Sequence, residues 1–231
     1  MKIGVIGGNG VAATNRLCDM VECKIVAAGA FRDAHHPEMI VWQATGVPSR
    51  SMFLEGLGPD WRPDYIRIAR ALKDLGCDYG CMCCNTAHYA IDEVVKGSGL
   101  GFVNLLEKVA LSVKERHLRK VVMFCSDGAR KFDLYGNVFR RICPEVELAY
   151  PSEARQLEVT KIICAVKTKE RFTRDPARML EELSEGEDAP VVLGCTDLRV
   201  AFPSGAPLKG NIVLDSLECL ADAIVEKHMC H

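Results

Sequence analysis

Short apolar segments alternate with longer amphipathic ones along most of this 231-residue chain. The short segments predict buried strands at residues 3–6, 25–28, 39–42, 80–83 and 101–104. The longer ones predict helices at residues 11–22, 64–75 and 86–96, and in the second of these Ile66, Ala69, Leu72 and Leu75 share one stripe. Alternation of this kind is typical of layered α/β proteins with mainly parallel sheets. The pattern therefore predicts an α/β fold.

The chain also contains a weak internal duplication. Residues 2–10 (KIGVIGGNG) align with residues 120–128 (KVVMFCSDG), and residues 83–85 align with residues 194–196. Repeats of this length indicate related structural units, so we expect two pseudo-symmetric α/β/α lobes. We expect one lobe from residues 1–105 together with 212–231, which fold back as a strand and a helix. The second lobe is expected from residues 106–211, with the link near residues 105–108.

Composition narrows the class of protein. A net charge of −2 gives no electrostatic basis for binding nucleic acid or an anionic membrane. No apolar run reaches the roughly 18 residues of a membrane-spanning helix. The first ten residues resemble a buried strand and lack the features of a signal peptide. The twelve cysteines, without an export signal, are therefore interpreted as reduced thiols in a cytoplasmic protein.

Two cysteines occupy matching places in the two halves. Cys84 begins the string CNTAH and Cys195 lies in GCTD, and each follows a predicted strand and precedes a predicted helix. A helix N-terminus offers backbone N–H groups and a positive dipole end, which favour a thiolate. Because ligands of open α/β sheets bind at the carboxyl ends of strands, the two thiols are expected to meet across one cleft. Two opposed thiols suit removal of a proton from one face of a carbon and its return to the other.

The glycine-rich string at residues 7–10 has three interpretations. It approximates a dinucleotide fingerprint, with Ala13 at the third position, but the expected acidic residue is not well placed after the next predicted strand. It is also compatible with a turn at Gly8 and Asn9 whose N–H groups bind a small anion such as a carboxylate. The third interpretation is a tight strand-to-helix turn without a ligand.

Cys81, Cys83, Cys84 and His88 resemble a metal-ligand set in spacing alone. Residues 80–83 are predicted to be a buried strand, and no second cluster completes a tetrahedral zinc site, so we predict no metal. A redox pair between Cys81 and Cys84 is disfavoured because it spans the end of a strand. His88 lies one helical turn after Cys84, and it either tunes that thiol or caps and packs.

The motifs GGNGxxAT, CNTAH and LGCTDL, in this order and spacing, resemble those of the cofactor-independent aspartate/glutamate racemase family over essentially the whole chain. The resemblance implies two lobes with an active site between them, no cofactor, and a homodimer. It implies that Cys84 and Cys195 are the catalytic acid/base pair. It further implies that Arg50 binds a substrate carboxylate, that Ser126 lies in a second-lobe loop at the site, and that Lys167 lies near the substrate side chain.

The chain departs from the family pattern at the first motif and at the second-lobe loop. The methionine, proline and glutamate of the usual Gly-Gly-Met-Gly-Pro-Glu are replaced, with Asn9, Val11 and Ala12 in that segment. Ala129 stands where the family often has a threonine. These positions line the expected pocket, so the identity of the amino acid stays open.

The sequence as a whole predicts a racemase for aspartate, glutamate or a related amino acid. Backbone N–H groups after Gly8 and Ser126, with Asn85, Thr86 and Thr196, are expected to bind the α-carboxylate and the charge that develops on it. Arg50 offers a two-pronged contact with a side-chain carboxylate. Two alternatives remain: an isomerase or decarboxylase of a small dicarboxylate, with Cys84 as a nucleophile, and a non-catalytic protein that binds a dicarboxylate or amino acid.

Overall fold

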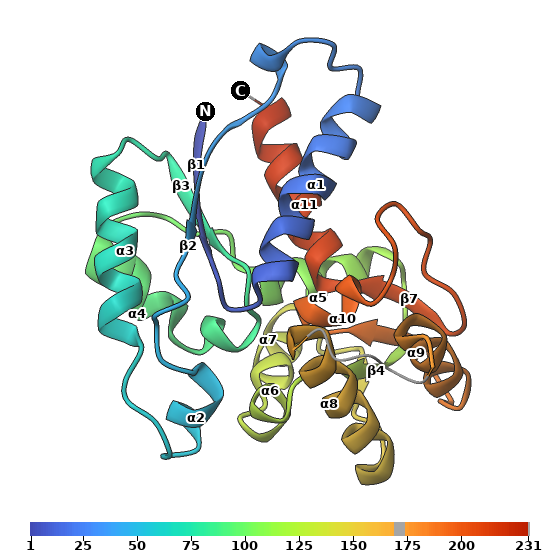
Figure 1. The fold of residues 1–231 in the computed structure, drawn as a ribbon. Helices are drawn as coiled ribbons and strands as arrows, with labels where there is room; N and C mark the ends of the chain where they lie inside the picture. The colour runs from blue at the N-terminus through green and yellow to red at the C-terminus, as the bar shows by residue number, and fades with distance from the viewer. Residues whose placement is uncertain (169–173, 231) are drawn as a thin grey trace.

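Two parallel sheets form the framework of the molecule, and each belongs to one half of the chain (Figure 1). The computed structural model describes residues 1–168 and 174–230, so residues 169–173 and 231 of the expected lobes lie outside it. The first sheet has the order β2-β1-β3 and the second has the order β5-β4-β6-β7. The strands are β1 (Lys2–Gly7), β2 (Glu38–Gln43), β3 (Tyr79–Met82), β4 (Lys120–Phe124), β5 (Glu147–Ala149), β6 (Val191–Leu193) and β7 (Ile212–Asp215). The first three positions of the second sheet repeat the order of the first, and the α/β prediction is confirmed.

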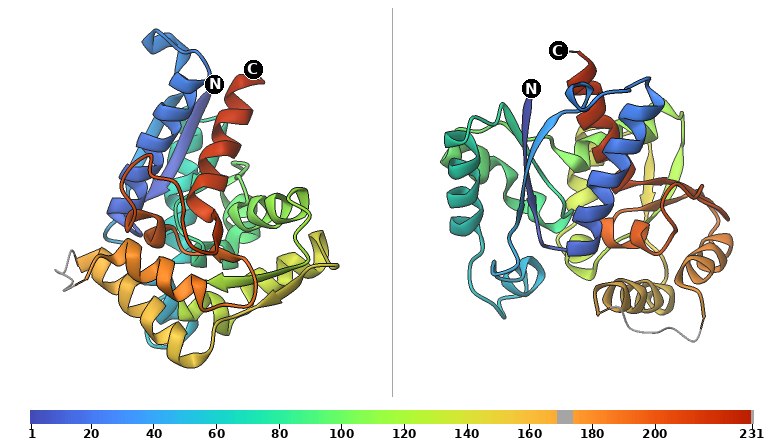
Figure 2. Two further views of the ribbon diagram at one scale, coloured as in Figure 1. Left: turned by 90° about the vertical axis from the view of Figure 1, so that its right-hand side faces the viewer. Right: turned by 45° about the horizontal axis from the view of Figure 1, so that its top comes forward.

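Helices cover both faces of each sheet (Figure 2). On one side of the first sheet, α3 (Arg62–Asp74) and α4 (Ile91–Ser98) enclose a core around Trp61 and Tyr65. Between the sheets, α1 (Val11–Ala27), α5 (Leu105–Glu115), α7 (Leu134–Ile142) and α11 (Ser216–Met229) contribute to one continuous core. On the outer side of the second sheet lie α8 (Glu153–Thr168) and α9 (Pro176–Glu185). The short elements are η1 (Asp33–His35), α2 (Arg50–Leu54), η2 (Thr86–Ala90), α6 (Asp127–Lys131) and α10 (Thr196–Val200).

The strand predicted at residues 25–28 is wrong, because these residues belong to the end of α1 and the turn after it. Leu17, Val21 and Ile25 are all buried and lie four residues apart, so Ile25 continues the apolar stripe of the helix. The predicted strand at residues 101–104 also differs. Only one bridge forms there, between Gly80 and Phe102, and Asn104 then caps the N-terminus of α5.

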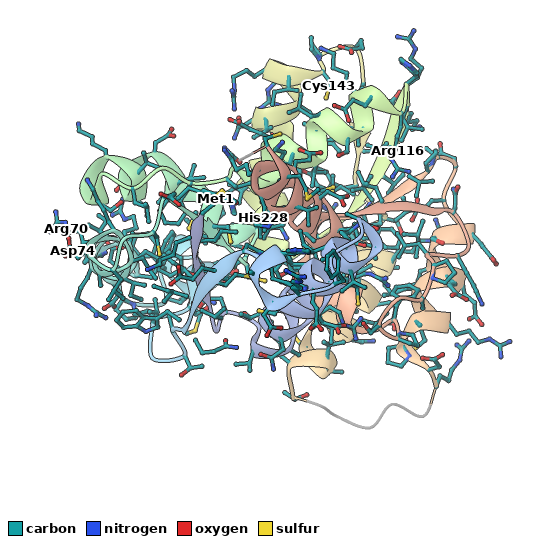
Figure 3. The ribbon with its side chains drawn as sticks, turned by 90° about the horizontal axis from the view of Figure 1, so that it is seen from above. Met1, Arg70, Asp74, Arg116, Cys143 and His228 are labelled. Atoms are coloured by element: carbon teal, nitrogen blue, oxygen red, sulfur yellow. The ribbon has the colours of Figure 1, made fainter. Side chains whose placement is uncertain are left out.

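The segment after residue 211 connects both halves. We expected it to join the first lobe, but β7 pairs in parallel with β6 and extends the second sheet. Its helix, α11, packs against α1 and α5 between the sheets. The N-terminus also lies close to this C-terminal helix, as the positions of Met1 and His228 show in the view from above (Figure 3). The exact lobe boundaries stay a prediction.

None of the helices in the described residues has both the length and the apolar composition that a membrane span requires.

Candidate active site between the lobes

Cys84 and Cys195 line the same small cavity, of about 60 Å³. Cys84 follows the carboxyl end of β3, and Cys195 follows the carboxyl end of β6 as the N-cap residue of α10. Because the strands of each sheet are parallel, these ends deliver one thiol from each lobe. All of the sequence-predicted site residues except Gly8 line this cavity: Asn9, Arg50, Cys84, Asn85, Thr86, Ser126, Lys167, Cys195 and Thr196. Ser49, Ser51 and Asp197 complete its lining.

A second and larger cavity, of about 380 Å³, adjoins the first. The two share Asn9, Arg50, Lys167 and Asp197, so these four side chains form the boundary between an inner and an outer cavity. Gly8, predicted as a site residue, lines the outer one. The remaining lining residues are Gly10, Val11, Ala12, Asn15 and Val166. A ligand bridging both cavities would contact both lobes.

The turn between β1 and α1 forms one wall of the outer cavity. Gly8 and Gly10 have positive φ angles of 81° and 143°, which side-chain-bearing residues rarely adopt. The Gly8 N–H donates to the Thr14 hydroxyl at 3.1 Å. The α1 helix begins at Val11 with no side-chain cap, and its first N–H groups therefore face this region unpaired by a capping side chain. This geometry is compatible with the anion-binding turn and with the turn without a ligand, and the choice between them stays a prediction.

Two hydrogen bonds across the inner cavity join the lobes. The Thr86 and Ser126 hydroxyls share one at 3.1 Å, and the Thr196 hydroxyl donates to the Cys83 carbonyl at 3.3 Å. Thr86 and Cys83 come from the first lobe, and Ser126 and Thr196 from the second. These hydroxyls therefore have a structural partner as well as access to the cavity.

The Asn85 amide is fixed by hydrogen bonds to two residues that do not line the cavity. Its Nδ2 donates to the Ser216 hydroxyl at 3.1 Å, and its Oδ1 accepts from the Tyr135 hydroxyl at 2.6 Å. One N–H of the amide remains for a ligand. Asn9 is also fixed, because its amide bonds to the Tyr65 hydroxyl. Both asparagines therefore present a fixed orientation to the cavity.

His88 positions the turn that carries Cys84. Its Nε2 accepts from the Leu105 N–H at 3.1 Å, and its Nδ1 lies 2.9 Å from the Cys84 carbonyl oxygen. Since a backbone N–H can only donate, Nε2 is the acceptor, and Nδ1 carries the proton and donates to Cys84. Burial lowers the pKa of His88 to about 4, although its backbone contacts oppose the shift. His88 therefore caps and packs as a neutral ring.

The ring nitrogens of His88 are both engaged with the backbone, and Cys81 and Cys83 are fully buried in or next to β3. Across the part of the chain that the structure describes, no three histidine, cysteine or acidic side chains are grouped as a metal site. Cys81, Cys83 and Cys125 are fully buried, they line neither cavity, and burial raises the pKa of their thiols.

The surroundings of Cys195, the thiol of the second lobe, strongly shift its pKa. Burial raises the pKa of Cys195 to about 12, the Asp197 carboxylate adds to the rise, and the Lys167 ammonium opposes it. Cys195 in the free protein is therefore a thiol at neutral pH. It can act first as a proton donor, and a bound cation or a closer approach of Lys167 would favour its ionisation.

Three charged side chains stand at the boundary of the cavities. Lys167 Nζ lies 3.3 Å from Asp197 Oδ2, and Asp197 is almost fully buried. Arg50 donates from Nη1 to the Pro48 carbonyl at 2.8 Å, and its Nε has no hydrogen-bond partner among the described residues. Sequence reasoning did not select Asp197, although its place directly after Thr196, in the first turn of α10, was a usable signal. Ser49 and Ser51 flank Arg50, and only that adjacency pointed to them.

Comparisons with known proteins agree with this geometry. The family model described as "Asp/Glu/Hydantoin racemase" matches residues 3–224. A curated relative, the broad specificity amino-acid racemase of Bacillus subtilis, is 23% identical over 236 residues, covering 99% of each chain.

Solved structures show the same fold. The aspartate racemase of Picrophilus torridus superposes with a TM-score of 0.82 at 23% identity, covering 99% of this chain and 94% of that one. An aspartate racemase homologue from Pyrococcus horikoshii gives a TM-score of 0.73 at 23% identity, covering 99% of each chain. The family match spans nearly every strand and helix that builds the two cavities. With its two thiols at the ends of equivalent strands, this chain belongs to the Asp/Glu/hydantoin racemase family.

Proposed function

We propose that this protein is a cofactor-independent amino acid racemase in which Cys84 and Cys195 exchange protons with opposite faces of the substrate α-carbon. The observation that carries the proposal is that both thiols line one cavity although they come from different sheets. The family match and the amino-acid racemase among its relatives support the same reaction class. The homodimer implied by the resemblance stays a prediction.

The cavities suggest how a substrate would lie. The reacting α-carbon belongs in the inner cavity, which is lined by both thiols. Arg50 lines both cavities, and its Nε has no hydrogen-bond partner among residues 1–168 and 174–230, so Arg50 is suited to bind the α-carboxylate. The substrate side chain would extend into the outer cavity, beside Val11, Ala12 and Val166. The outer cavity, of about 380 Å³, is much larger than the inner one, of about 60 Å³, so a long side chain is better accommodated in the outer cavity.

The proton balance requires one thiolate and one thiol at a time. In one direction of the reaction, Cys84 acts as the base and Cys195 as the acid. Burial raises the pKa of Cys195 to about 12, which favours the thiol form that an acid requires. The Cα–H proton passes to the Cys84 sulfur, and the Cys195 S–H proton adds to the opposite face of the carbon. The electron pair left on the carbon spreads into the carboxylate, where Arg50 stabilises the transition state more than the ground state. The reverse reaction begins from the exchanged states, so each sulfur must act as an acid in one direction and as a base in the other.

Replacement of either thiol tests this mechanism. Cys84→Ala and Cys195→Ala are each expected to reduce racemisation by several orders of magnitude, because one face of the carbon then lacks its acid/base group. The measurements are the D/L ratio by chiral chromatography and deuterium uptake at the α-carbon in D₂O by mass spectrometry, with single L-amino acids as substrates. Cys23→Ala removes an exposed thiol of α1 and serves as the control.

The proposal fails if either variant interconverts enantiomers at close to the parent rate. Binding of amino acids without any deuterium uptake by the unmodified protein would instead support the non-catalytic alternative.

A further inference from the structure

Asp197 lines both cavities and has no role in the proton transfer proposed above. Among residues 1–168 and 174–230, it is the only acidic side chain that lines either cavity. We propose, on the basis of the proposed function, that Asp197 binds the α-ammonium group of the substrate and so makes the site select amino acids over carboxylates that lack the amino group. The proposal concerns a residue that determines specificity, and it can be tested by binding alone.

The pairing of charges at the site leads to this assignment. Lys167 is already bonded to Asp197 at 3.3 Å, whereas Arg50 has no acidic partner within the described part of the chain. Lys167 and Asp197 neutralise one another, so Arg50 carries the net positive charge that the ligand meets at the boundary. An α-amino acid matches this pattern, because its carboxylate pairs with Arg50 and its ammonium with Asp197. A carboxylate without an amino group would offer no cation to Asp197, and a second carboxylate on such a ligand would place a negative charge beside it.

The carboxylate of Asp197 has capacity for another donor. Two carboxylate oxygens offer about four acceptor sites, and within the described residues only the Lys167 side chain bonds to them. The Asp197 side chain is 4% exposed, so water cannot solvate it fully. A buried carboxylate with a single, half-exposed ammonium partner gains from a second cationic donor. The substrate ammonium would supply that donor from within the cavity.

The glycine-rich turn leaves room for this carboxylate. A Cβ atom on Gly10 would collide with Oδ1 of Asp197. Gly10 also has a φ angle of 143°, so a side chain is excluded there by conformation as well as by space. The first lobe therefore approaches Asp197 closely with backbone alone. This close approach places the carboxylate at the boundary of the two cavities, where a substrate crosses from one to the other.

Binding of matched ligand pairs tests the proposal. The pairs are L-aspartate with succinate and L-alanine with propionate, which differ within each pair only by the amino group. Dissociation constants are measured by calorimetry on the full chain carrying Cys84→Ala, so that turnover does not interfere. In this background we expect the amino member of each pair to bind about 10- to 100-fold more tightly, as a charge-assisted hydrogen bond would give.

Asp197→Asn keeps the shape of the side chain and removes its charge. We expect the preference for the amino member to disappear and succinate to bind about tenfold more tightly, because Lys167 is released. Glu158→Gln removes an exposed carboxylate of the same helix that carries Lys167, and it should change neither pair. If Asp197→Asn keeps the preference for amino ligands, the proposal is wrong.

Lys167→Gln provides a test that does not depend on folding of the Asp197 variant. It leaves the Asp197 carboxylate in place without its partner, so the amino preference should persist or increase. Loss of that preference would overturn the proposal. These outcomes are separate from those of the racemase test, because binding selectivity without α-deuterium uptake would support the role of Asp197 and refute the racemase.

Discussion

His88, a neutral side chain, holds the turn that carries Cys84 in place. It accepts the Leu105 N–H and donates to the Cys84 carbonyl, so the first residue of α5 and the thiol-bearing turn are linked through one ring. A protonated ring could not accept from Leu105. The arrangement therefore requires the neutral form, in agreement with the direction in which burial shifts the pKa of His88.

This requirement predicts a dependence of stability on pH. The pKa of His88 is about 4 in the folded protein and about 6.5 in an unfolded chain, so the unfolded state binds more protons between these values. The contribution of His88 to the free energy of unfolding should therefore be fully present above about pH 6.5. It should decrease by at most about 3 kcal/mol as the pH falls to 4. Urea unfolding at several pH values measures this loss.

Other groups titrate over the same range, so the comparison variant is His88→Gln. It can donate and accept hydrogen bonds but does not ionise, and its pH dependence should be shallower than that of the unmodified protein. Equal slopes for the two proteins would contradict the assigned role of His88.

The residues of the site were predictable to different degrees. Cys84 and Cys195 were accessible from sequence because each sits between an apolar run and a helical pattern, at matching places in the repeat. Their placement around one cavity is as expected. The partnership of Lys167 with Asp197 was not accessible, because it joins α8 to the first turn of α10. Pairing between side chains of different elements depends on tertiary packing, which periodicity does not contain.

At the scale of elements, side chains accept the hydrogen bonds of the first three backbone N–H groups of α5. The Asn104 Oδ1 accepts from the N–H groups of Leu106 and Glu107, at 3.1 Å and 3.3 Å. His88 accepts from Leu105, the first residue of the helix. The two side chains therefore cap α5 together and fix its start beside the Cys84 turn.

Removal of this cap should have a measurable cost. Asn104→Ala is expected to lower the free energy of unfolding by about 1 kcal/mol, because two backbone donors lose their acceptor. Asn104→Asp keeps an acceptor at the same position and should retain most of the stability. Denaturant titrations of the three proteins measure the difference. A cost for Asn104→Asp as large as that for Asn104→Ala would show that capping is not the cause.

Two short apolar runs, one of them at the start of α5, were predicted incorrectly as strands. The apolar run at residues 101–104 was interpreted as a strand, yet it contributes one bridge at Phe102 and then the cap of α5. The run at residues 25–28 was also interpreted as a strand, although it ends α1. Short apolar runs fit a strand and a buried helical turn equally well. The longer pattern at residues 64–75 was specific, and α3 covers Arg62–Asp74.

At the scale of the whole molecule, two sheets with a repeated strand order deliver equivalent strand ends to one place. The repeat in the sequence indicated this arrangement, whereas the addition of β7 to the second sheet was not foreseen. The segment after β7 then crosses back, and α11 packs on α1 of the first lobe. At the end of β7 the chain therefore passes from the second sheet into the core between the two sheets.

A buried ion pair lies at this point. Arg199 of α10 and Asp215, at the end of β7, approach to 3.3 Å between Nε and Oδ2, with side chains only 7% and 0% exposed. Asp215 also accepts from the Glu218 N–H at 2.8 Å and so caps α11. Burial raises the pKa of Asp215 to about 6, although Arg199 opposes the shift. The pair connects the helix that follows Cys195 to the helix between the lobes.

A double-mutant cycle measures the contribution of this connection. Asp215→Asn keeps a good N-cap for α11 but leaves the Arg199 charge buried without its counter-ion, and it should cost about 3–5 kcal/mol of stability. Arg199→Met should also destabilise the protein. The double variant should be less destabilised than the sum of the two, because neither partner is then left alone. Urea unfolding of the four proteins gives the coupling, and strict additivity of the two losses would show that the two side chains act independently.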